Sequence, residues 1–322
     1  MSHSSNNLAR RVGGLSHRWL PFADAATVDL TLPRLWRLSL FQLSTGMAIV
    51  LLTGTLNRVM VVELGQGTSL VSLMLAIPLL LAPARALIGY RSDHHRSYLG
   101  WRRIPYLWSG TLMQFGGLAF MPFALILMIE PHSGPPIIGP IAAMGSFLLT
   151  GLGMHVSQTA GLALATDLAT EESRPRVVAL LYLMLLVGMI SSAVIFAALL
   201  DDFSYVRLIQ VIQSAAVITL ILNVAAMWKQ EVRHPELTDH ERERPTFGSA
   251  WGEFINLPKA RRLLWALGLG TMGFTMQDIL LEPYGAHVLG LSVSETTLLT
   301  ALFAGGMVLA LLMTSRTLRR GV

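Results

Sequence analysis

The feature that most restricts the fold is a series of eight long apolar runs separated by polar segments. Each run is long enough to cross about 30 Å of hydrocarbon as a helix of roughly 20 residues. Hydrophobic residues make up 53% of the 322 residues and charged residues only 13%, a balance that soluble domains of this size do not show. We therefore predict an all-α integral membrane protein. The runs cover residues 38–62, 70–90, 104–129, 137–165, 177–200, 206–228, 263–281 and 291–314.

Polar stretches divide the runs into four segments. Residues 1–35 are polar and lack the apolar core of a signal peptide, so we expect them to remain as a cytoplasmic N-terminal segment. Residues 36–228 are expected to form a six-helix N-terminal bundle. Residues 229–262 are expected to form a cytoplasmic linker, whose aromatic positions suit a short helix at the membrane interface. Residues 263–322 supply two further helices and a cytoplasmic tail.

The distribution of positive charge orients the predicted bundle. Of the 24 Lys and Arg residues, 21 fall in segments on one side, Arg58 and Arg207 fall on the other, and Arg85 lies within a run. Positive charges collect on the cytoplasmic side of membrane proteins, so both termini are expected in the cytoplasm. The net charge of +5 therefore reflects topology. No basic domain or nucleic-acid motif is present, and we predict no nucleic-acid partner.

The turn between the second and third runs carries the most specific short pattern. Gly89 is followed four residues later by Asp93, and the turn continues through Arg96 to Arg102 and Arg103. This plan resembles the signature loop of the major facilitator superfamily, where the acidic residue meets a neighbouring helix end and the arginines lock the cytoplasmic face. An ordinary basic turn is the alternative. Six predicted helices, a long linker and then two more helices also follow the facilitator plan of two similar halves. The resemblance therefore implies a major facilitator-like fold with an incomplete, two-helix C-terminal half.

A second charged cluster follows the fourth run. Asp167, Arg174 and Arg176 resemble the second cytoplasmic cluster of facilitators, and a solvated turn is the alternative. A weak internal repeat also favours two related halves. Residues 56–65 and 276–285 each place an amide and a charge near the outer end of a helix, followed by a glutamate and a glycine.

Charged residues inside the runs are the main functional candidates, since each costs about 2.5–3.5 kcal/mol at mid-membrane unless it is paired or hydrated. Arg58 and Asp278 occupy near-equivalent places in the first and seventh runs. We predict that they pair across a central cavity, with Glu63 and Glu282 close by. The alternative is that each side chain extends to the outer membrane surface.

No catalytic pattern is present. The chain has no P-loop, no metal-ligand spacing and no nucleophile with a base at a recognisable spacing, so we predict neither a catalytic nor a metal site and no enzyme activity.

Longer motifs resemble the PucC/LhaA family. The resemblance runs from about residue 20 to the C-terminus. The motifs are LPFADAA at 20–26, LSLFQ at 38–42, LTGTLNRVM at 52–60, RALIGYRSD at 85–93, GWRR at 100–103, QFGGLAFMPFAL at 114–125 and QDILLEPYG at 277–285.

This resemblance implies a facilitator-type protein of the inner, intracytoplasmic membrane of a phototrophic bacterium. Members assist the assembly of light-harvesting antennae by handling or delivering bacteriochlorophyll. The implied partners are antenna α and β polypeptides, the reaction centre or pigment-synthesis enzymes, and membrane lipid. The implied cofactor is bacteriochlorophyll, held at least transiently, and carotenoid is left open. His155 is the only histidine inside a predicted run, and a neutral imidazole suits a chlorin magnesium. A packed, hydrogen-bonded histidine is the alternative.

The family resembles a twelve-helix facilitator, whereas eight runs are found here. The expectation is either a truncation or four helices supplied by another polypeptide. Two functions remain: an antenna assembly factor, or a small-solute secondary transporter that uses the charges of the first and seventh runs. Because those charges gather at outer helix ends, the first is favoured.

Overall fold

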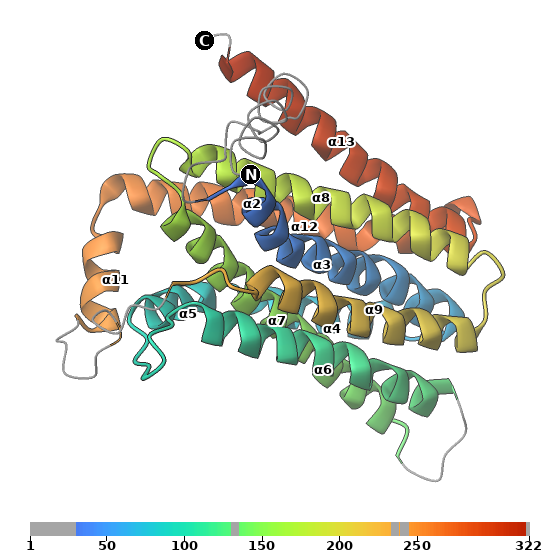
Figure 1. Cartoon of the computed structure of the whole chain (residues 1–322). Coiled ribbons are helices and arrows are strands. Elements are labelled where there is room, and N and C mark those ends of the chain that lie inside the picture. The colour runs from blue at the N-terminus through green and yellow to red at the C-terminus, as the bar shows by residue number, and fades with distance from the viewer. Residues whose placement is uncertain (1–29, 130–134, 233–237, 239–244, 320–322) are drawn as a thin grey trace, which may run out of the picture.

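The computed structural model describes residues 30–129, 135–232, 238 and 245–319, and all regular structure among them is helical. The long helices lie side by side as a bundle, with α11 at one end (Figure 1). This confirms the predicted all-α class. The elements are α2 (Leu32–Leu38), α3 (Leu40–Ile49), the π-helical segments η2 (Val50–Leu56) and η3 (Val59–Glu63), α4 (Thr68–Leu80), α5 (Ala84–Asp93), α6 (Ile104–Ile129), α7 (Ile138–Leu168), α8 (Arg174–Leu199), α9 (Tyr205–Met227), α11 (Phe247–Ile255), α12 (Pro258–Leu289) and α13 (Val293–Arg319).

Seven helical stretches among the described residues are long and apolar enough to cross a membrane, and they coincide, within a few residues at some ends, with seven of the eight predicted runs. The remaining run, 263–281, lies in α12. That helix is 32 residues long, but it is not among the seven. Glycines, Gln277 and Asp278 lower the mean hydropathy of its apolar stretch.

Two predicted boundaries differ from the helix ends that the structure describes. The first spanning stretch begins at Leu32, before residue 36. The prediction missed this start because α2 contains Arg34 and Arg37 and is therefore not part of a continuous apolar run. In the same way α12 begins at Pro258, inside the predicted linker, because its first turns contain Lys259 and two arginines. Most of the predicted N-terminal segment, residues 1–29, lies outside the described residues.

The first spanning stretch, Leu32–Glu63, is the central helix of the bundle, and its most apolar window is 83% buried. Its second half is π-helical, with backbone bonds that span five residues, such as Leu64 N–H to the Val59 carbonyl at 3.0 Å. A π-helix is rare and recurs at functional sites. The Asn57 amide donates to the Thr53 carbonyl at 3.0 Å and so supports the altered winding.

The second spanning stretch, Thr68–Asp93, is interrupted between α4 and α5. Pro83 lies at the break, and proline has no N–H with which to continue an α-helical ladder. The turn instead contains shorter bonds, including Ala82 N–H to the Leu79 carbonyl at 2.9 Å. The Pro78 carbonyl is therefore free of its usual partner four residues later.

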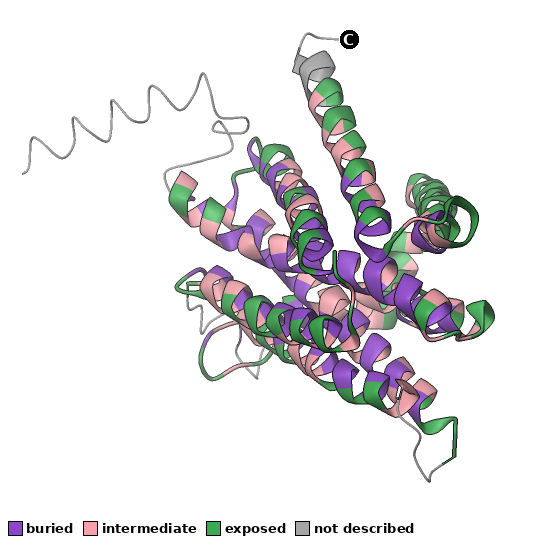
Figure 2. Ribbon diagram, turned by 90° about the vertical axis from the view of Figure 1, so that its right-hand side faces the viewer, coloured by how far each residue is buried: buried purple, intermediate pink, exposed green. Residues whose placement is uncertain are grey.

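Helices α6 and α7 approach each other backbone to backbone. A Cβ built on Gly153 of α7 would lie 2.4 Å from the Gln114 backbone nitrogen of α6, so no larger residue fits without moving a helix. Small residues at such interfaces allow close packing in membranes, where the hydrophobic effect does not drive helices together. Buried residues lie on the faces turned into the bundle (Figure 2).

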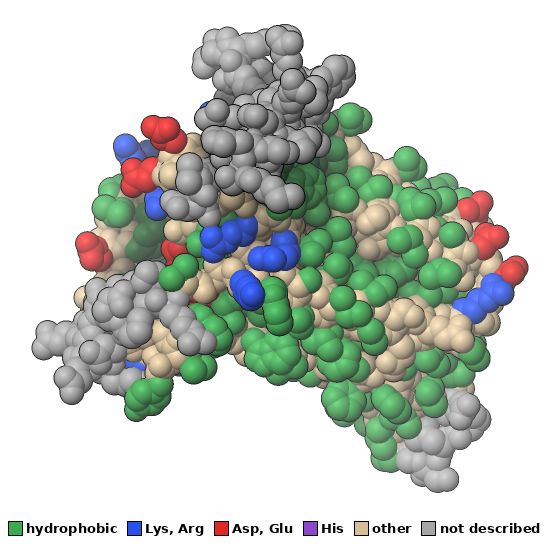
Figure 3. All heavy atoms as spheres, in the orientation of Figure 1, with side chains coloured by type: hydrophobic (Ala, Val, Ile, Leu, Met, Phe, Trp, Pro, Cys, Tyr) green, Lys and Arg blue, Asp and Glu red, His purple; other side chains and the backbone are tan. Residues whose placement is uncertain are grey.

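The outer surface is largely apolar. Hydrophobic side chains cover the middle of the face seen in Figure 3, while charged side chains lie toward its left part and right edge. The most exposed stretch is in α12, where every residue from 261 to 274 is exposed. Trp265 and Phe274 are 69% and 68% exposed. The second half of α12 packs on η2, η3 and α13.

Candidate functional site

A pocket of about 260 Å³ lies between the central helix, α4, α7 and α12. Its walls are mostly apolar, and the polar groups on them come from three of these elements. Thr53 lies on the central helix, His155 and Gln158 lie on α7, and Asp278 lies on α12 beside Thr275. The pocket therefore joins two of the sequence-predicted residues, His155 and Asp278, which are 123 positions apart.

His155 is held by the break between α4 and α5. Its Nε2 lies 2.9 Å from the Pro78 carbonyl oxygen. A carbonyl only accepts hydrogen bonds, so Nε2 carries the proton and Nδ1 carries the lone pair. Nδ1 is buried and has no hydrogen-bond partner among the described residues.

This arrangement does not fit a chlorin ligand at His155. Nε2 is engaged by Pro78, and Nδ1 is covered by packed protein atoms. The adjoining pocket, at about 260 Å³, is smaller than the roughly 300–1,000 Å³ typical of sites for drug-sized ligands, and a tetrapyrrole is larger still. In this structure His155 is a packed, hydrogen-bonded residue of the pocket wall.

We predicted that Arg58 pairs with Asp278, but in the structure Arg58 pairs with Glu63. Arg58 Nη1 lies 2.6 Å from Glu63 Oε1, and none of the ion pairs among the described residues joins Arg58 to Asp278. The reason is the winding of η3. Residues five apart share a face of a π-helix but not of an α-helix, so Arg58 meets Glu63 within its own helix. Arg58 Nη2 also donates to the Leu291 carbonyl at 3.2 Å.

Glu282 lies in the contact between α12, the central helix and α13. Its Oε1 accepts the Thr300 hydroxyl at 2.6 Å, and the residue is only 1% exposed. Gly54 makes room for it, because a Cβ there would lie 2.3 Å from Glu282 Oε1. The other oxygen, Oε2, is buried without a hydrogen-bond partner among the described residues. The sequence thus predicted the proximity of Glu282 to the first helix, but not its partner on α13.

A buried side-chain amide also joins the central helix to α12. Asn57 Nδ2 donates to the Ile279 carbonyl on α12 at 2.7 Å, and Asn57 is 2% exposed. The repeat between residues 56–65 and 276–285 singled out this amide, but its partner could not be found from sequence, because backbone carbonyls carry no sequence signal.

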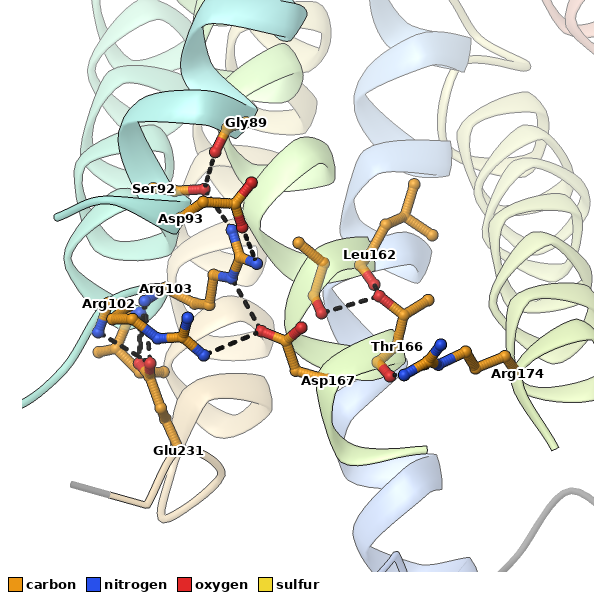
Figure 4. A network of polar contacts seen from close by, with 12 residues as sticks. Gly89, Ser92, Asp93, Arg102, Arg103, Leu162, Thr166, Asp167, Arg174 and Glu231 are labelled. Carbon is orange, nitrogen blue, oxygen red and sulfur yellow. Dashed lines mark hydrogen bonds and ion pairs between the residues drawn. The ribbon is translucent and has the colours of Figure 1, made fainter. Parts of the chain in front are cut away.

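Charged residues from three segments meet at one end of the bundle, which we call the arginine-rich end (Figure 4). Arg103 pairs with Asp93 at the end of α5, and its Nε lies 3.0 Å from Asp167 Oδ2 at the end of α7. Its Nη1 also donates to Ser92 Oγ at 2.6 Å, and Arg103 is only 4% exposed. Arg102 lies 3.6 Å from the same Asp167 oxygen. The two clusters predicted separately are therefore one network.

Glu231 completes this network and was missed from sequence. Its carboxylate accepts the backbone N–H groups of Arg102, Arg103 and Ile104 at 2.8–3.1 Å. These groups open α6, and a helix N-terminus favours negative charge. Glu231 follows α9, more than 120 residues later in the chain, so no local pattern pointed to it.

The remaining predicted residues lie at the edge of the network. Arg174 donates through Nε to the Thr166 carbonyl at 3.2 Å (Figure 4). Its Nη1 also lies 3.9 Å from Glu171 Oε1. Arg176 is exposed. Gly89 accepts the Ser92 hydroxyl through its carbonyl at 2.9 Å. Exposed Arg96 lines a shallow pocket beside α5.

The family model described as PUCC protein matches residues 55–322 of this chain. Protein PucC of Rhodovulum sulfidophilum is 54% identical over 327 residues, which cover 100% of this chain and 72% of that protein. A Rhodobacter capsulatus protein, described as uncharacterised and lying in the puhA-bchM intergenic region, is 55% identical over 315 residues. That alignment covers 97% of this chain and 66% of the other.

A more distant relative is the bacteriochlorophyll synthase 44.5 kDa chain of Rhodobacter capsulatus. It is 29% identical over 282 residues, or 87% of this chain and 63% of that protein. Such a distant match does not establish catalysis here. This chain spans between 63% and 72% of the length of these three relatives. No solved structure matches it significantly.

Proposed function

Because this chain belongs to the PucC family, we propose that it is an assembly factor for photosynthetic antenna complexes in a phototrophic bacterium. In this role it binds antenna α and β polypeptides in the membrane and hands bacteriochlorophyll to them. The reaction centre and pigment-synthesis enzymes are further partners in the proposal. The name of the distant bacteriochlorophyll synthase relative supports a link to this pigment.

The chain is a multi-pass membrane protein by its apolar helices and its family. We place it in the inner, intracytoplasmic membrane, with the arginine-rich end and both termini in the cytoplasm. Support comes from the bias of Lys and Arg toward one side, which orients membrane proteins.

The observation that carries the proposal is the exposed apolar stretch of α12. Residues 261–274 are all exposed, and apart from two arginines at the start they carry no charge. Gly268, Gly270 and Gly273 have open space in front of them. Small residues on an apolar helix let another membrane helix approach closely. This surface suits another membrane helix better than it suits a water-soluble substrate, and we propose an antenna helix as that partner.

The buried charges of the site also favour an assembly role. Arg58 is neutralised by Glu63 within its own helix, and Glu282 is enclosed by Thr300 and Gly54. Neither lines the pocket between the central helix, α4, α7 and α12. We therefore propose that pigment is handled as cargo on the lipid-facing surface and not on His155, and we assign no carotenoid site.

A small-solute transporter is the second candidate, because the same pocket has one carboxylate, Asp278, facing a largely apolar space. Its volume of about 260 Å³ suits a small solute. A transporter predicts uptake that depends on Asp278, whereas the assembly factor predicts none.

The deciding experiment is purification of the protein in mild detergent from a phototrophic host, followed by pigment extraction and identification of copurifying polypeptides. Bacteriochlorophyll together with antenna polypeptides, at a reproducible ratio to the protein, supports the proposal. A colourless protein without antenna polypeptides, combined with solute uptake that Asp278→Asn abolishes, overturns it in favour of transport.

A matched pair of variants locates the binding surface. Gly270→Leu places a bulky side chain in the open space on α12, and Gly145→Leu does the same at an exposed position of α7. Since neither glycine has atoms in front of it, both variants should fold. Loss of antenna polypeptides in Gly270→Leu alone supports docking on α12, and equal retention in both variants contradicts it.

A further inference from the structure

A second hollow lies at the arginine-rich end, on the outside of the bundle between the start of α6 and the end of α9. Its volume is about 260 Å³. Three of the chain's seven tryptophans line it: Trp101 and Trp108 near the start of α6, and Trp228 just after α9. Lys229 lines the same hollow. The three tryptophans and Lys229 lie outside the candidate site described above, whereas Glu231, which also lines the hollow, belongs to the charged network beside it.

The backbone on one side of the hollow is fixed at two neighbouring residues. Gln230 is completely buried, and its amide and Arg34 exchange hydrogen bonds of 3.1 Å in both directions. Glu231 is fixed in turn at the N-terminus of α6. Lys229 lies directly before these two anchors, which hold the chain in place there.

Lys229 adopts a backbone conformation that lysine normally avoids. Its φ is +54°, and it is the only non-glycine residue with positive φ in the described part of the chain. Such strained conformations persist only where the surroundings enforce them, and they concentrate at ligand-binding sites. Here the two anchors enforce the conformation, which brings the lysine to the tryptophan-lined hollow.

Beside Gln230 and the Glu231 carboxylate, which the N–H groups at the start of α6 hold, the lining of the hollow has three chemical parts. Indole faces attract organic ammonium groups through their π-electrons. The Lys229 ammonium is a point charge that attracts phosphate. Ile104, Val224 and Met227 supply an apolar wall that continues onto the lipid-facing helices. Tryptophan is enriched at membrane interfaces in general, and here three tryptophans share one hollow with a cation.

We propose that this hollow binds the headgroup of a zwitterionic phospholipid. The phosphate lies at Lys229, the ammonium group lies on the indole faces, and an acyl chain follows the apolar wall. The bound lipid covers the contact between α6 and α9 at the level where both helices leave the membrane.

The test uses the full chain in nanodiscs of phosphatidylcholine or of phosphatidylglycerol, with retained lipid counted by native mass spectrometry after transfer to detergent. Lys229→Gly removes the ammonium, and glycine adopts positive φ without strain, so this variant should fold at least as well as the original. Trp228→Leu removes one indole. Trp265→Leu, on exposed α12, is the control.

We expect retained phosphatidylcholine to fall roughly five- to tenfold in Lys229→Gly and Trp228→Leu, the range that loss of one cation contact predicts. Trp265→Leu should leave retention unchanged. Equal or stronger retention of phosphatidylglycerol would overturn the assignment to a zwitterionic lipid. Equal loss in all three variants, or no loss in any, would overturn the site. Displacement of the lipid by soluble phosphocholine at similar concentration would assign the hollow to a soluble ligand instead.

Discussion

The ion pair between Arg58 and Glu63 leads to the sharpest prediction. Here the π-helical winding of the central helix determines the partner of Arg58, and a carboxylate on α12 does not. We consider a double-mutant cycle of Arg58→Gln and Glu63→Gln. A second cycle combines Arg58→Gln with Asp278→Asn. Glu63→Gln and Asp278→Asn keep side-chain size, while Arg58→Gln shortens the side chain and also removes its bond to the Leu291 carbonyl. That loss is common to both cycles, so the difference between their coupling energies reports the partner of the Arg58 charge.

The expected magnitude follows from burial. The Arg58 side chain is 5% exposed and the Glu63 side chain 30%, with 2.6 Å between Nη1 and Oε1. Breaking a fully buried pair costs about 3–5 kcal/mol, and the partial exposure of Glu63 reduces this. We therefore expect each single substitution to lower the free energy of unfolding by about 2 kcal/mol. The coupling should be about 1.5–2 kcal/mol with Glu63 and below about 0.5 kcal/mol with Asp278.

The assay is reversible unfolding in mixed micelles with an increasing fraction of sodium dodecyl sulfate, followed by circular dichroism of the helices. A larger coupling with Asp278 than with Glu63 would refute the reasoning and restore an interhelical pair. A coupling near zero in both cycles would show that the π-helical register of η3 does not form in the micelle.

Three further substitutions test other contacts by the same unfolding assay. Gly153→Ala inserts a methyl group against the facing backbone of α6 and should destabilise the protein by about 1–3 kcal/mol, while Gly145→Ala, with open space before it, should change little. Thr300→Val removes the hydroxyl that donates to the buried carboxyl of α12 and should cost about 1–3 kcal/mol; Thr297→Val, whose hydroxyl bonds only within its own helix, should cost less. Glu231→Gln removes the charge at the N-terminus of α6 and should cost about 1–2 kcal/mol, and an unchanged stability would contradict the capping role.

Sequence reasoning recovered those parts of the molecule that depend on local composition. Apolar runs located the spanning helices, since a helix in lipid needs a long apolar stretch. The spacing of Gly89, Asp93 and Arg103 marked the turn that the structure places in the charged network. The pattern was specific because the residues lie within fifteen positions of one another.

The partners of those residues could not be predicted, because each depends on a long-range contact or on an irregular backbone. Glu231 reaches α6 from the far end of α9, and His155 contacts the Pro78 carbonyl, which lacks its usual partner four residues later because the helix is interrupted before Pro83. The partner of Arg58 depends on a π-helical register. Sequence reasoning placed Glu63 close to Arg58 but named Asp278 as the partner, because nothing in the sequence indicated the π-helical winding.

The π-helical winding of the central helix also has a consequence for how the sequence can change in length. A π-turn contains one residue more than the α-turn that it replaces. Deleting a single residue from η2 would let the backbone return to ordinary α-helical bonding. Because the α-turn contains one residue fewer, Asn57 and Arg58 would keep their directions toward the Ile279 and Leu291 carbonyls. A deletion in the regular helix α3 has no such compensation, since each residue of an α-helix turns the chain by about 100°. We therefore expect a single deletion to be tolerated in η2 and excluded from α3.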